Sequence, residues 1–236
     1  MLLMMMNAYI MAHELVHGEK RHSVSILKEK IDRKMALGFY LESDDAVLNS
    51  DVLKDIAFNE EKDTAFTKEQ EMEADDLGFQ YLVTAGYNPG AAAAAMSVLA
   101  KHSEERNTTG TIKDKSSSNY STVSERMKEN AGRMYKYSGK HVKVENGWLV
   151  INGEKIFMPL ASGRYTQQER AYLTAGKMAR LYHDEVLNEF SYLQGIVYNG
   201  SASFYQAEPG EKGEEITMAL NKVIAKDRKI FITKKS

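Results

Sequence analysis

The chain contains no cysteine among its 236 residues, which excludes disulfide bonds and thiolate metal sites but does not select a compartment. Its net charge is only −2, so it lacks the excess of positive charge that nucleic-acid binding requires. It also lacks the roughly 18 consecutive apolar residues that a transmembrane segment needs. The remaining composition, 43% hydrophobic and 27% charged, is typical of a globular protein with one large or two modest domains.

The first six residues, Met1–Met6, are apolar but have no basic residue before them, as a signal peptide would, and the run ends at Asn7. We expect them to form the buried beginning of the helix that carries the first motif. The localisation is unknown from the sequence. The chain as written is expected to be soluble without a signal peptide, and an extracytoplasmic location stays open if it is a fragment of a longer secreted parent.

Two histidines stand four residues apart near the start, in the segment His13-Glu14-Leu15-Val16-His17. Residues four apart lie on one face of a helix, so both imidazoles can bind the same metal ion. Glu14 can reach a water molecule on that metal, as in the zinc-protease pattern H-E-x-x-H. The alternative is a pair of surface histidines without a metal, and these five residues alone do not decide between the two.

A later acidic segment supplies a candidate for the third ligand. Catalytic zinc takes three protein ligands and keeps one position open. Glu71 and Asp75 are four residues apart, so on one helical face Glu71 can bind the metal while Asp75 accepts a hydrogen bond from a ligand imidazole. The alternative is an acidic face in water, which is our interpretation of the neighbouring Glu69, Glu73 and Asp76.

Three blocks in this order resemble the HtpX-like and CAAX prenyl endopeptidase family of zinc metallopeptidases, which are gluzincins and include quality-control proteases. The blocks are H-E-L-V-H, E-M-E-A-D-D-L-G and A-G-Y-N-P, against the family's H-E-x-x-H, E-x-E-A-D-x-x-G and A-G-Y-x-P. The resemblance extends to about residue 135. It implies that His13, His17 and Glu71 hold one Zn²⁺ per chain, that Glu14 is the general base, and that Asp75 orients a ligand histidine.

The family often has a Thr-His-Pro block with an arginine six positions after the histidine. The matching segment here is Asn119-Tyr120-Ser121 with Arg126, so the arginine is present and Tyr120 replaces the histidine. A tyrosine hydroxyl is a neutral donor at pH 7, and the candidates for donation to the oxyanion of peptide hydrolysis are therefore Tyr120 and Arg126. The alternative is that Tyr120 only lies in a polar loop.

Hydrophobic periodicity predicts that residues 1–137 are mainly α-helical, and the resemblance implies that they form a zincin-type peptidase domain. A first helix is expected over Leu2–Leu37, with a break near Ser23 and a stop at Gly38. We interpret His22 as a solvated or capping residue. The apolar residues expected in the core of this helix are Ile10, Leu15, Ile26, Leu27, Ile31 and Met35.

The second metal helix is expected to begin at a capping box of Thr67 and Gln70 and to end before Gly86. In this position the helix can aim the Glu71 carboxylate. The other elements expected in this part are a short helix at residues 52–58, a helix that begins at Pro89, a loop at 102–118 and a helix at 123–135.

The pattern changes from helical to alternating near Ser138, so residues 138–236 are predicted to form a small α+β domain that folds alone and has no known role. Asn146-Gly147 and Asn152-Gly153 are hairpin signals. The elements expected after these hairpins are a helix at residues 167–187, two strands at 192–206 that turn at Asn199-Gly200, a helix at 214–225 and a strand at 229–233.

The sequence therefore predicts a zinc-dependent endopeptidase that acts on a polypeptide substrate, with Glu14 taking a proton from the zinc-activated water and passing it to the leaving amine. The main alternative is a non-catalytic, chaperone-like metal-binding module derived from such a peptidase, because only twelve residues precede His13 where the family usually has a longer segment. A structural zinc site is a weaker alternative, since such sites usually have four ligands that include cysteine.

Overall fold

The computed structural model describes the backbone of residues 2–41, 66–108 and 123–235, and the side chains except near the ends of these ranges. The described ranges contain seven helices and two three-stranded antiparallel sheets. The helix predicted at residues 52–58 and the candidate Tyr120 lie outside the described residues. In chain order the elements are α1 (Leu2–Glu19), α2 (His22–Leu41), α4 (Lys68–Thr84), α5 (Ala91–Thr108), α6 (Val123–Tyr137), β1 (Val142–Glu145), β2 (Trp148–Ile151), β3 (Glu154–Phe157), α7 (Gln167–His183), β4 (Phe190–Leu193), β5 (Ile196–Asn199), β6 (Ala202–Gln206) and α8 (Gly213–Lys235).

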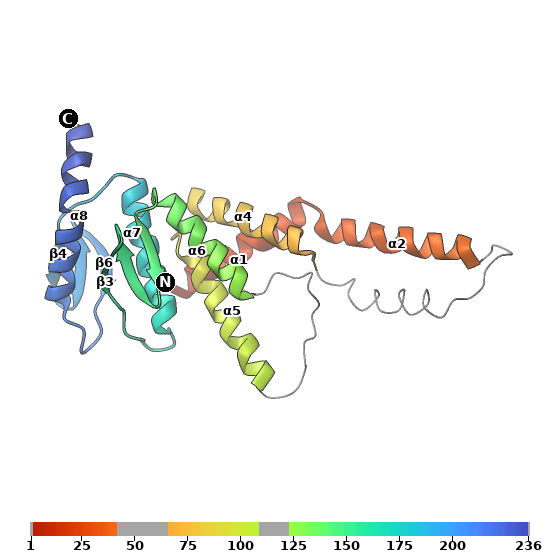
Figure 1. Cartoon of the computed structure of the whole chain (residues 1–236), viewed down its shortest axis with the longest axis horizontal. Coiled ribbons are helices and arrows are strands. Elements are labelled where there is room, and N and C mark those ends of the chain that lie inside the picture. The colour runs from red at the N-terminus through yellow and green to blue at the C-terminus, as the bar shows by residue number, and fades with distance from the viewer. Residues whose placement is uncertain (1, 42–65, 109–122, 236) are drawn as a thin grey trace.

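Helix α7 lies between a helical part and the two sheets (Figure 1). On one side it packs on α5 and α6, which with α1 and α4 form the helical part, and on the other it packs on β1 and β2. Helix α8 contacts all three of β3, β4 and β5. The predicted order of a helical part followed by a small α+β part is therefore confirmed. No helix in the described ranges is long and apolar enough to cross a membrane.

A single hydrophobic core runs through both parts of the chain. Its buried members include Tyr9 and Leu82 in the helical part and Leu149 and Ile224 in the α+β part. A hydrogen bond also joins the two parts: Asn88 Nδ2 donates to the carbonyl of Leu173 at 2.8 Å. The boundary predicted after residue 137 thus separates two kinds of secondary structure that share one core, and independent folding of either part stays a prediction.

The first two helices bury less apolar surface than predicted. They break at Lys20–Arg21, where Arg21 takes a left-handed φ of 55°, close to the break expected at Ser23. Helix α2 then points away from the rest of the molecule (Figure 1) and continues through Gly38, which does not stop it.

The predicted core of these helices was mostly wrong. Ile10, Leu15, Leu27 and Ile31 are exposed, and the lead-in has an exposed Met4 as well as a buried Met6. Ile26 is half-buried, and the side chain of Met35 lies outside the described residues. Periodicity identifies an apolar helix face but does not tell whether another element covers it.

Three further predictions of secondary structure were wrong. Helix α5 begins at Ala91, after Pro89, and continues to Thr108, so residues 102–108 of the predicted loop are helical, because no glycine or proline interrupts them. The rest of that predicted loop lies outside the described residues. A hairpin at Gln194-Gly195, with both φ angles positive, adds a third strand to the predicted pair. Helix α8 includes the apolar segment 229–233, where a strand was predicted, because no glycine or proline ends the helix after Gly213.

The α+β part consists of two successive units of three strands and a helix. Each sheet is a meander, in the orders β1-β2-β3 and β4-β5-β6. The middle strand of each sheet has an irregularity in register, at Leu149/Val150 and at Val197/Tyr198. The hairpins predicted at Asn146-Gly147 and Asn152-Gly153 are confirmed, and all four residues have positive φ, as such turns require.

Candidate metal centre

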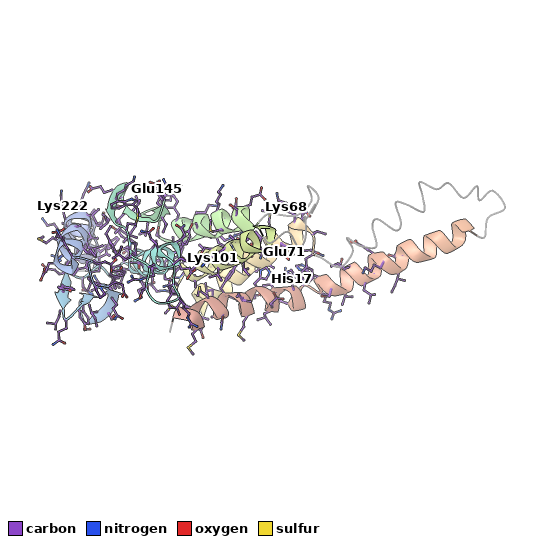
Figure 2. All side chains as sticks on the ribbon, turned by 90° about the horizontal axis from the view of Figure 1, so that it is seen from below. His17, Lys68, Glu71, Lys101, Glu145 and Lys222 are labelled. Atoms are coloured by element: carbon purple, nitrogen blue, oxygen red, sulfur yellow. The ribbon has the colours of Figure 1, made fainter. Side chains whose placement is uncertain are left out.

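Helices α1 and α4 bring the predicted ligands together. His13 and His17 lie on α1, and Glu71 lies in the first turn of α4, close to His17 in Figure 2. The predicted capping box is confirmed: the amide of Gln70 donates to Thr67 Oγ1 at 3.3 Å, and the amide of Thr67 donates to Gln70 Oε1 at 3.0 Å. The cap fixes the start of α4 and thereby the direction of the Glu71 side chain.

A glycine permits the close approach of these two helices. A Cβ atom on Gly78 would lie 3.1 Å from both the nitrogen and the Cα of His13. Gly78 is the last residue of the E-M-E-A-D-D-L-G block, so this block supplies both the acidic residues and the small residue on which α1 rests. The close packing explains why Asp75, one turn before Gly78, reaches the His13 ring.

The ligand atoms of His13, His17 and Glu71 all lie within 4.8 Å of one another. His13 Nε2 is 3.1 Å from His17 Nε2 and 3.4 Å from Glu71 Oε2, and His17 Nε2 is 3.9 Å from Glu71 Oε1. Ligand atoms about 2.1 Å from a tetrahedral zinc ion lie roughly 3.4 Å from one another. The observed separations therefore fit three ligands of one such ion.

The Glu71 carboxylate also has unused binding capacity. Its Oε2 atom is buried and makes no hydrogen bond to the described residues. Arg126 Nη1 lies 2.6 Å from it as an ion pair, but outside hydrogen-bond geometry. The ion pair offsets part of the negative charge, and the oxygen keeps lone pairs that can coordinate a metal cation.

Asp75 is the centre of a buried hydrogen-bond network behind His13. Its Oδ1 lies 3.0 Å from His13 Nδ1 and accepts a hydrogen bond from the Tyr9 hydroxyl at 2.7 Å. Arg126 Nε donates to Asp75 Oδ2 at 2.8 Å, and Nη2 donates to Oδ1 at 2.7 Å. Asn130 Nδ2 in turn donates to the Tyr9 hydroxyl at 3.0 Å. The predicted contact between Asp75 and a ligand histidine is present, on the ring nitrogen away from the metal position.

Burial and charged neighbours shift the pKa values of three residues in this site. Burial lowers the pKa of His13, but the contacts with Asp75 and Glu71 outweigh burial and raise that pKa to about 9. Burial raises the pKa of Asp75, yet the Arg126 guanidinium, together with His13, holds it well below its usual range. Burial and the nearby His13 lower the pKa of His17. The carboxylates of Asp75 and Glu71 thus favour positive charge at His13, whereas the neutral form of His17 is favoured, which is the form in which a histidine binds a metal.

The two predicted catalytic residues in the described ranges, Glu14 and Arg126, differ in their surroundings. The Glu14 side chain is exposed and has no hydrogen-bond or ion-pair partner among the described residues. Arg126 is directed to the carboxylates of Asp75 and Glu71, and its Nη2 also lies 3.4 Å from His13 Nε2. The prediction of an exposed acidic surface is confirmed for Glu69, Glu73 and Asp76.

Four residues around the predicted ligands were not expected from the sequence. Tyr9 precedes His13 by one helical turn, and Asn130 follows Arg126 by one turn, so helical spacing was the available signal for both. Phe66 stacks on His17 with ring centroids 3.7 Å apart. His22, which was interpreted as a solvated or capping residue, is not solvated. It is the first residue of α2 and is buried in contact with His17.

No protein-family profile, curated protein or solved structure matches this chain. The resemblance to zinc metallopeptidases therefore depends on the three sequence blocks and on the geometry of the residues within them. The residues that the structure describes contain a candidate metal-binding triad, His13, His17 and Glu71.

Replacement of a ligand is expected to remove the metal. The purified protein should bind about one zinc ion per chain, and His17→Ala and Glu71→Ala should each lose most of it at micromolar free zinc, because two ligands hold zinc far more weakly than three. Inductively coupled plasma mass spectrometry after gel filtration measures the content. His183→Ala and Glu69→Ala, which change exposed residues of the same types, should retain it. Full zinc content in both ligand variants would exclude the triad.

Proposed function

We propose that this protein is a zinc-dependent endopeptidase of the HtpX-like type, with a zincin-type helical part. The observation that carries the proposal is the convergence of His13, His17 and the Glu71 carboxylate, one oxygen of which has no hydrogen bond to the described residues. Glu14 follows His13 on α1 and has no hydrogen-bond or ion-pair partner among the described residues. Structural zinc sites have four protein ligands, whereas this cluster has three within the ranges that the structure describes. Three ligands leave a position for substrate or water.

In the proposed hydrolysis, Glu14 transfers the proton and Asp75 orients a zinc ligand. Bound zinc would polarise the scissile carbonyl and lower the pKa of its water to about 7. Glu14 accepts the proton of the attacking water and transfers it to the leaving amine, so the peptide bond breaks with no net change in protonation of the enzyme. Asp75 holds the Nδ1 proton of His13 and thereby leaves Nε2 free as a ligand.

Arg126 has a positioning role in this proposal. Three of its guanidinium nitrogens face Asp75 and Glu71, so it keeps both carboxylates ionised and in place. Because these guanidinium nitrogens already contact the carboxylates, Arg126 is a poorer candidate than predicted for the donor to the oxyanion. Tyr120, which lies outside the described residues, stays the sequence-based candidate for that donor.

A non-catalytic, chaperone-like module is the second candidate function. It is favoured by the large apolar side chains that α1 exposes near the metal ligands, with Met11 71% and Leu15 62% exposed. Such side chains can bind unfolded polypeptide. An intact Glu14 favours the peptidase, because binding alone does not require a base beside the metal.

Hydrolysis of an unfolded protein tests the choice between the two functions. The zinc-loaded protein should release primary amines from casein, an excess of 1,10-phenanthroline should reduce the rate to background, and added zinc should restore it. Release of amines that is insensitive to the chelator would point to a contaminating protease. Zinc binding with no hydrolysis of casein or of other unfolded proteins would support the chaperone-like module instead.

A further inference from the structure

A buried histidine outside the ligand set lies directly behind His17. His22 Nδ1 is 2.9 Å from His17 Nδ1, and His22 Nε2 is 3.2 Å from Glu73 Oε2. His17 and His22 are 4% and 5% exposed. Buried polar groups in native proteins are nearly always hydrogen-bonded, and these two contacts involve both nitrogens of His22.

The protonation of the rings follows from the role of His17 as a ligand. If His17 Nε2 binds the metal, its proton must be on Nδ1. His22 Nδ1 must then accept this proton's hydrogen bond, so His22 carries its own proton on Nε2. That proton faces the Glu73 carboxylate, which accepts it. The hydrogen bonds therefore run in a single direction, from His17 through His22 to Glu73.

The break between α1 and α2 places His22 in this position. On a continuous helix a residue five positions after His17 would lie about 140° around the axis from it. The left-handed φ of Arg21 interrupts the helix just before His22 and lets the two rings meet, with their planes inclined by 75°. Phe66 covers the His17 ring, and this apolar cover strengthens a hydrogen bond by excluding water.

We infer that His22 is a positioning residue for the proposed metal centre: it holds His17 in the Nδ1–H tautomer and passes the orienting effect of the Glu73 carboxylate to this ligand. His13 is oriented directly by Asp75, whereas His17 is oriented through an intervening imidazole. This inference deepens the proposed function and depends on His17 being a ligand. The inference also gives a role to Glu73. This residue was predicted to face solvent, but its carboxylate contacts His22.

Zinc affinity tests the inference independently of activity. His22→Phe keeps a ring of similar size but removes both hydrogen bonds, and zinc affinity should fall by about 10- to 100-fold, the range for loss of a group that orients a metal ligand. His22→Asn places an acceptor oxygen near the former Nδ1 position and should recover most of that loss. Competition with a fluorescent zinc chelator measures the affinities, and circular dichroism of the metal-free proteins checks that each variant is folded.

A matched control separates the hydrogen bond from the neighbouring surface ion pair. Glu73 also pairs with Lys20 at 2.9 Å, where both side chains are well exposed. Lys20→Ala should leave zinc affinity unchanged, whereas Glu73→Ala should lower it. In the zinc-loaded wild type, nitrogen-15 NMR of the imidazoles should show His22 protonated on Nε2 and not on Nδ1.

The outcomes distinguish this inference from the proposed function. Absence of zinc binding by the wild type would overturn the metal centre itself. Normal zinc binding by wild type with an affinity of His22→Phe within twofold of it would overturn only the role of His22. A loss in His22→Phe that His22→Asn does not recover would assign His22 to packing and likewise overturn the inference.

Discussion

Glu14→Gln is expected to retain its zinc and to lose activity on casein by about 10²- to 10⁴-fold, the range that general acid–base catalysis contributes. The amide can still form a hydrogen bond to water but cannot take its proton. The fold and the ligand set should be unaffected, because the Glu14 side chain is exposed and has no partner among the described residues. Steady-state kinetics with a fluorogenic peptide and a parallel zinc determination measure the two effects.

Glu69→Gln is the matched control for this variant. Glu69 is an exposed acidic residue near the start of α4, and the same removal of charge there should leave kcat within twofold of wild type. Loss of zinc from Glu14→Gln would mean that Glu14 acts in binding. A zinc-loaded Glu14→Gln protein with wild-type kcat would exclude Glu14 as the base and would require a different proton acceptor.

Gly176→Ala is expected to destabilise the whole protein by about 3 kcal/mol or more, at or above the usual upper limit for overpacking. A Cβ atom at Gly176 would lie 1.8 Å from Asn88 Oδ1 and 2.2 Å from the backbone nitrogen of Gly90. A rotamer change cannot relieve the contact with backbone, so α7 would have to move away from the turn between α4 and α5. Chemical denaturation gives the change in the free energy of unfolding.

Gly132→Ala makes the same change where there is space. Nothing lies within 4 Å of a Cβ atom at this position in α6. The free energy of unfolding should therefore rise by about 0.5–1 kcal/mol, because alanine has a better helix propensity than glycine. Two probes should follow each transition: far-ultraviolet circular dichroism for the helices and fluorescence of the single tryptophan, Trp148, in β2. Coincident transitions would show that both parts unfold as one unit, whereas separate transitions would support the predicted division after residue 137.

Local spacing was sufficient to predict much of the metal centre. The four-residue intervals between His13 and His17 and between Glu71 and Asp75 place each pair on one helical face, whatever the rest of the chain does. The Thr67–Gln70 box and the Asn-Gly hairpins are equally local, because the side chains and φ angles they require belong to the turn itself. These features are present in the structure for that reason.

Contacts that depend on tertiary packing were not predictable from the sequence. The pairing of Tyr9 with Asp75 requires α1 and α4 to lie side by side, and no interval along the chain encodes it. The contact of His22 with His17 requires a helix break at a non-glycine residue, which propensity places only approximately. The exposure of Leu15 and Leu27 was missed because an apolar stripe looks the same whether or not it is covered.

The position of Glu71 within α4 has a dynamic consequence for the metal centre. Glu71 is the fourth residue of α4 and so belongs to the turn that opens first when a helix end frays. While this turn is open, His13 and His17 remain adjacent on α1 but the third ligand is withdrawn. Apparent affinity is intrinsic affinity scaled by the fraction of molecules in the binding-competent state. A cap stabilises a helix by about 1 kcal/mol, which corresponds to roughly a fivefold change in the ratio of closed to open turns. The two side chains of the capping box, which are not among the three candidate ligands, therefore contribute to the apparent affinity of the centre for zinc.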